Sequence, residues 1–269
     1  MNMFIIDNEL AVRLGCFFGV FIAMGIWELL APRRTLTSPK SRRWISNLFI
    51  TLLNSLVVRI FFPAAAVGMA FMSDWSGWGL FNILRVPSLP AGIMSILLLD
   101  LTIYSQHVLF HRVALFWRLH RMHHTDLDID VTTGSRFHTF EIILSMEIKI
   151  VIVVLLGAPA WSVLVFEVLL NATSLFTHSN VRISARADRF LRTIIVTPDM
   201  HRVHHSVLTG ETNSNFGFNF PWWDRLFGTY RDQPEKGHEA MTIGLPDYQD
   251  NKYLTLPWML AVPFLGKNR

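Results

Sequence analysis

The chain has 269 residues, of which 51% are hydrophobic and only 16% are charged. A soluble globular domain carries about 25% charged residues, so this composition favours a protein embedded in a membrane. The net charge of +4 could suit nucleic acid, but no recognition motif accompanies the basic residues. The single cysteine, Cys16, excludes a disulfide framework or a thiolate metal site built within the chain.

The first apolar segment, residues 12–31, is long enough to cross a hydrocarbon core of about 30 Å as a helix. It lacks the short apolar region and the small-residue cleavage site of a secretory signal, so we expect a membrane helix. The stretch PRRTLTSPKSRR that follows contains five basic residues. By the positive-inside rule this loop is expected on the cytoplasmic side.

Three further apolar stretches follow the basic loop. Residues 45–72 contain Pro63, which predicts a kink. The span at residues 91–110 should return toward the cytoplasm, and residues 141–176 are interrupted by GAP at 157–159, which predicts a helical hairpin. We therefore expect an all-α integral membrane protein. Its bundle should contain about four to five membrane-embedded helices and carry a cytoplasmic, histidine-rich helical cap.

The histidines are the main chemical signal in the sequence. HVLFH places two of them four residues apart, and HRMHH and HRVHH each place three at positions i, i+3 and i+4. Such positions share one face of a helix, with Cβ atoms about 5–6 Å apart, so each segment could point its imidazoles at one volume. The clustered residues are His107, His111, His120, His123, His124, His201, His204 and His205.

Imidazole is the commonest nitrogen ligand of iron, copper, zinc and nickel. With His138 and His178, which stand singly, there are ten candidate ligands, more than one six-coordinate ion can use, so we predict two ions. His238 lies outside every cluster and is interpreted as structural. Of the carboxylates near the motifs, one or two could orient a ligand imidazole; Asp126 and Asp130 are interpreted as solvated loop residues.

The motifs also occur in a familiar order. In chain order the motifs are HxxxH, HxxHH, a histidine in RFH, a histidine in FTHSN, and an HxxHH preceded by TPDM and followed by NFGFNFPWWDRLFGTY. This order resembles that of the fatty acid hydroxylase/sterol desaturase superfamily of integral membrane oxygenases. The resemblance runs over residues 100–231, about half of the chain. It implies N-terminal transmembrane helices with connecting loops in residues 1–90, a catalytic domain in residues 91–235 and a C-terminal tail in residues 236–269.

The resemblance implies a di-iron centre held by histidine, with zinc as a possible substitute in purified protein. The implied ligands are His107, His111, His120, His123, His124, His178, His201, His204 and His205, with His138 as the tenth. At His138 the chain departs from the family pattern, because Thr139 follows it where the family usually has proline. Trp223, Asp224, Phe227 and Gly228 match the family's WDxLFGT signature, which we interpret as a structural clamp that closes the cap.

Members of this superfamily use O₂ and two electrons to hydroxylate or desaturate a lipid, and the sequence does not choose between these reactions or among sterol, fatty acyl and related substrates. The resemblance implies a separate electron donor, a ferredoxin or a b-type cytochrome with its reductase. The basic loop at residues 33–43, or Arg182, Arg186, Arg189 and Arg192, could dock an acidic donor or contact anionic lipid.

Two other classes of protein remain as alternatives. A non-catalytic membrane metal-binding protein, such as a zinc carrier or sensor, would need ionisable residues along a transmembrane path. The apolar spans contain few of them, Arg59, Asp100 and Glu167 among them. A di-zinc hydrolase would need a bridging carboxylate and an open water position, and the excess of histidine argues against it.

Overall fold

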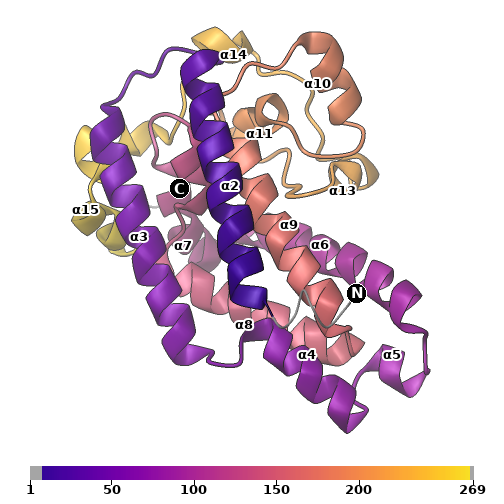
Figure 1. Cartoon of the computed structure of the whole chain (residues 1–269). Helices are drawn as coiled ribbons and strands as arrows, with labels where there is room; N and C mark the ends of the chain where they lie inside the picture. The colour runs from indigo at the N-terminus through magenta and orange to yellow at the C-terminus, as the bar shows by residue number, and fades with distance from the viewer. Residues whose placement is uncertain (1–7, 267–269) are drawn as a thin grey trace.

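The computed structural model describes residues 8–266, and these residues form an all-α protein with two isolated β-bridges. Six helices make up the body (Figure 1): α2 (Glu9–Leu30), α3 (Lys40–Phe61), α4 (Ala65–Ser76), α6 (Ser88–Arg112), α8 (Thr139–Leu156) and α9 (Ala160–His178). The short α5 (Leu80–Ile83) joins α4 to α6. Four helical segments are long and apolar enough to cross a membrane: Glu9–Leu30, Lys40–Ile83, Ser88–Arg112 and Ala160–His178. The predicted all-α membrane protein is confirmed.

The predicted kink at Pro63 is a complete break between helices. Helix α3 ends at Phe61 and α4 begins at Ala65. Proline has no N–H to donate, and its ring clashes with the carbonyl four residues earlier. The chain therefore turns between these helices, and α4 packs against α8 and α9.

The predicted hairpin at residues 157–159 is also present, as α8 and α9. Gly157 ends α8 in the left-handed conformation, with φ 64°, and its N–H bonds back to the last turn of the helix. A Cβ atom at Gly157 would lie 2.7 Å from the carbonyl oxygen of Trp78, so only glycine fits this close approach. Pro159 then precedes the first turn of α9.

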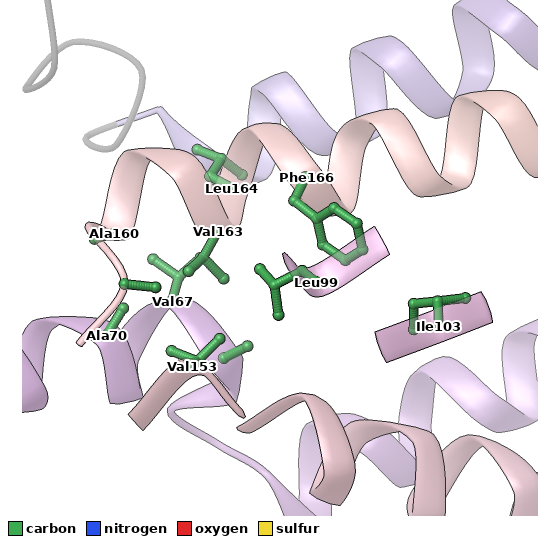
Figure 2. Close-up of a cluster of buried hydrophobic side chains, with 11 residues drawn as sticks. Val67, Ala70, Leu99, Ile103, Val153, Ala160, Val163, Leu164 and Phe166 are labelled. Atoms are coloured by element: carbon green, nitrogen blue, oxygen red, sulfur yellow. The ribbon is translucent and has the colours of Figure 1, made fainter. Parts of the chain in front are cut away.

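A cluster of buried apolar side chains holds α4, α6, α8 and α9 together (Figure 2). Its members include Val67 and Ala70 from α4, Leu99 from α6, Val153 from α8 and Phe166 from α9. The outer face of α2 is different, because Leu14, Phe18, Ile22 and Ile26 repeat every four residues and are all exposed. An exposed apolar stripe on a helix of this length is what contact with lipid requires.

The other helices gather toward one end of the long helices, in the upper part of Figure 1. We call residues 113–138 and 179–266 the cap. It contains α7 (Ala114–His124), η1 (Val131–Ser135), α10 (Ala185–Leu191), α11 (Pro198–His204), α12 (Thr209–Thr212), α13 (Trp222–Leu226), α14 (Gly237–Ala240) and α15 (Leu256–Ala261), with three short 3₁₀ turns between residues 246 and 264.

Buried charges join the cap to the long helices, and here two sequence-based interpretations are wrong. Asp126 and Asp130 are not solvated loop acids: neither side chain is exposed, and each lies 2.6 Å from a guanidinium nitrogen of Arg43. Burial alone would raise the pKa of Asp126, but Arg43 and Arg136 outweigh it and lower that pKa. Arg43, which was expected in the basic loop, lies in the first turn of α3. It is internal and offers no charge to a docking partner.

Candidate metal centre

Nine of the ten predicted ligands lie in two groups of buried imidazoles. Within each group, one ring nitrogen from every residue lies within 4.8 Å of the others. The five-histidine cluster contains His107, His111, His120, His124 and His204. The four-histidine cluster contains His123, His178, His201 and His205.

The clusters draw on four helices, and each HxxHH motif is divided between them. Helix α6 supplies His107 and His111, and the last residue of α9 is His178. On α7, His120 and His124 are four residues apart and share a face, whereas His123 is turned toward the other cluster. The motif at the end of α11 divides likewise. The structure corrects the expectation that each segment points its imidazoles at one volume, because one helix serves two adjacent volumes. Around a helix, residue i+4 lies about 40° from residue i, whereas residue i+3 lies about 60° from residue i on the other side.

Hydrogen bonds fix which ring nitrogen carries the proton in several of these histidines. A backbone carbonyl can only accept, so a ring nitrogen bonded to it must be the N–H nitrogen. The Nδ1 atoms of four histidines donate in this way over 2.7–3.0 Å: His107 to Phe216, His123 to Arg136, His178 to Ser174 and His204 to Ser214. In a neutral imidazole of this kind, Nε2 carries no proton and its lone pair is free to bind a cation.

These bare nitrogens face one another. His123 Nε2 lies 3.1 Å from His178 Nε2 in the four-histidine cluster. Neither atom has a proton to share, so the lone pairs repel unless a cation lies beside both. Two nitrogens that each bind one ion at about 2.1 Å are roughly 3.0–3.4 Å apart. The donor set therefore fits a metal ion.

Burial keeps the imidazoles in the neutral form that binds metal. Desolvation, together with the neighbouring His178, lowers the pKa of His123 well below its usual value. Desolvation lowers the pKa of His204 to about 3. The Nε2 atom of His204 is buried without a hydrogen-bond partner, which is costly for a polar atom unless something binds it. A metal ion would satisfy this atom.

Glu141 is a site residue that the sequence reasoning missed. Its Oε1 atom accepts the Nδ1–H of His120 at 2.6 Å, and both side chains are buried. That bond leaves His120 Nε2 bare as well, 3.1 Å from His107 Nε2 in the five-histidine cluster. A carboxylate that orients one of the clustered imidazoles was expected among the aspartates, but it comes from the first turn of α8. The only signal was an acid three residues after His138.

The structure does not bring His138, the expected tenth ligand, into either cluster. His138 precedes the first turn of α8, where its Nδ1 accepts the N–H of Phe140. Its Nε2 lies 3.3 Å from the carbonyl oxygen of Leu260. Both ring nitrogens are thus used in capping the helix and joining it to α15. His238 also lies outside the clusters, next to Gln233, in keeping with a structural role.

Comparisons with known proteins were made for the whole chain. The family model described as fatty acid hydroxylase matches residues 92–229, about half of the chain. The chain is 30% identical to the ornithine lipid hydroxylase OlsE of Rhizobium tropici, over 66% of this chain and 51% of that protein. It is 27% identical to the alkylglycerol monooxygenase of Homo sapiens, over 68% of this chain and 40% of that protein. The chain thus spans about half or less of the length of these curated relatives. No solved structure matches it.

Proposed function

The chain belongs to the fatty acid hydroxylase family, and from this premise we propose that it is a membrane-bound, O₂-dependent di-iron oxygenase that acts on a lipid C–H bond. Hydroxylation is favoured over desaturation because the curated relatives are named as a hydroxylase and monooxygenases. The observation that carries the proposal is the pair of adjacent clusters in which deprotonated imidazole nitrogens face one another.

We assign one iron ion to each cluster, with zinc as a substitute in protein purified without added iron. The proposed ligands are the nine clustered histidines, and His138 is left out. Bound iron would supply the O₂ chemistry that an unactivated C–H bond requires. The chain itself orients the imidazoles through Glu141 and the backbone carbonyls. It also keeps water away, since every proposed ligand is buried and Phe137 stacks on His123 with a centroid distance of 4.6 Å.

The substrate is proposed to come from the bilayer and the electrons from a separate protein, a ferredoxin or a b-type cytochrome with its reductase. Arg182, Arg186 and Arg189 are exposed on the cap around α10 and could attract an acidic donor. Arg192 is not available, because it pairs with Asp188 and Asp232. By the positive-inside rule we propose that the cap and its clusters face the cytoplasm. Residues 91–235 would form the catalytic domain.

A zinc carrier or sensor is less well supported. Its ionisable residues should line a path through the membrane. Two of the charged residues within the spans, one on α9 and one on α6, instead hold fixed partners. Glu167 of α9 pairs with Lys149 and Arg13, and Asp100 of α6 accepts the indole N–H of Trp223 at 2.8 Å.

The test combines metal content with a product assay. Protein purified in detergent with iron-57 should contain two iron ions per chain, and its Mössbauer spectrum should show a coupled pair. Iron-loaded protein given bacterial or animal lipid extracts, a reducing partner and ¹⁸O₂ should yield a lipid heavier by one ¹⁸O atom. A product lighter by two hydrogens would mean desaturation. Iron-loaded, reduced protein that transforms no lipid across the extracts would contradict the proposed activity.

A further inference from the structure

We propose that Asp224 is a positioning residue for the five-histidine cluster. Its carboxylate holds the loop of residues 214–217, and the carbonyl groups of that loop orient His107 and His204. The inference deepens the proposed function and rests on it, because the orientation matters only if these imidazoles bind a metal ion.

The carboxylate of Asp224 is completely buried and binds the loop through its backbone. Oδ1 accepts the N–H of Phe216 and Oδ2 accepts the N–H of Gly217, both at 2.8 Å. Oδ1 also accepts the hydroxyl of Thr229 at 2.7 Å. A Cβ atom at Gly217 would lie 2.7 Å from Oδ2 and 2.8 Å from the carbonyl oxygen of Phe220, so the bond needs glycine at this position.

The loop held in this way presents two carbonyl groups to metal ligands. The Phe216 carbonyl accepts the Nδ1–H of His107, and the Ser214 carbonyl accepts that of His204, each at 2.8 Å. Both histidines belong to the five-histidine cluster. In the four-histidine cluster, the carbonyls that orient His123 and His178 come from Arg136 and Ser174, so the carbonyl groups of this loop bond imidazoles of one cluster only.

The segment around Asp224 is also fastened to the two helices that carry these histidines. On α6, Asp100 accepts the indole N–H of Trp223, and the hydroxyl of Tyr104 lies 2.9 Å from that of Thr229. On α11, the carbonyl of Met200 accepts the amide N–H of Asn215 at 2.9 Å. The loop is therefore fixed relative to both helices, which is what fixed ring orientations require.

The first test is Asp224→Asn, which keeps the shape of the side chain. The asparagine has one oxygen for two backbone N–H groups, and its NH₂ would face the second. We expect about 10–100-fold weaker binding of one ion, as for other groups that orient metal ligands. In chelator titrations of the iron-57 protein, one ion should be lost early and the Mössbauer signal of the other should stay. Asp232→Asn, the same change at an exposed carboxylate that contacts Arg192, is the control and should titrate like wild type.

Gly217→Ala tests the inference independently, because it leaves the carboxylate in place and displaces the loop by steric overlap. The same ion should be affected. If Asp224→Asn does not fold, Thr229→Val, which deletes one bond to the carboxylate, should still shift the Mössbauer signal of one ion. An unchanged titration and spectrum in the folded variants, or equal weakening of both ions, would overturn the inference. Wild-type protein that binds no metal would instead overturn the proposed function.

Discussion

Replacement of Glu141 by glutamine tests directly whether this carboxylate strengthens metal binding by the five-histidine cluster. The carboxylate accepts the Nδ1–H of His120 at 2.6 Å, with side-chain exposures of 4% for Glu141 and 2% for His120. Glutamine keeps an acceptor oxygen but removes the charge, and charge-assisted hydrogen bonds are about twice as strong as neutral ones. Loss of a group that orients a metal ligand costs about 10–100-fold in affinity, which corresponds to about 1.4–2.8 kcal/mol.

The assay for this variant is iron retention against increasing chelator, measured on detergent-purified protein. One of the two ions should leave at about 10–100-fold lower chelator concentration than in wild type. Glu147→Gln, on the same helix but exposed, controls for the change in charge. If Glu141→Gln and Glu147→Gln release iron on the same curve as wild type, the carboxylate does not tune His120, and the reasoning from the short buried contact is refuted.

Three further predictions follow from burial and hydrogen bonding. His204→Ala should lose iron from the five-histidine cluster, whereas His138→Ala should retain both ions; iron loss in the His138 variant would place that residue in the site. Arg43→Met removes the cation that pairs with two buried carboxylates and should lower the free energy of unfolding by about 3–5 kcal/mol. Denaturation in mixed micelles measures this, and an unchanged midpoint would contradict it. The pKa values of His204 and His238 are lowered to about 3 and 4 by burial, while an unfolded imidazole titrates near 6.5. The unfolded state therefore binds more protons at these histidines below that value, so their contribution to the stability of metal-free protein should be lost as the pH drops from about 6.5 toward 4. Equal midpoints of thermal unfolding at pH 5 and pH 8 would refute this.

The sequence by itself indicated the class of fold and most of the histidines that come together in the two clusters. Long apolar segments have few folded solutions other than membrane helices, because backbone polar groups in lipid must bond within the segment. The break at Pro63 and the hairpin at residues 157–159 also follow from local chemistry, since proline lacks a donor and Gly157 takes a left-handed conformation. Histidines spaced at i, i+3 and i+4 predicted metal binding for a similarly local reason, because a helix brings such positions close together.

Only the tertiary structure decided how these histidines are divided between the clusters and which groups orient them. The spacing shows which residues lie on one helix face but not which faces converge, so it could not divide HRMHH between two clusters. The contact of Glu141 with His120 spans 21 residues, and that of Phe216 with His107 spans 109. His138 was predicted as a ligand because of its place in a motif order, yet the start of α8 engages both of its ring nitrogens. Contacts of this range depend on how the helices pack, which no local pattern encodes.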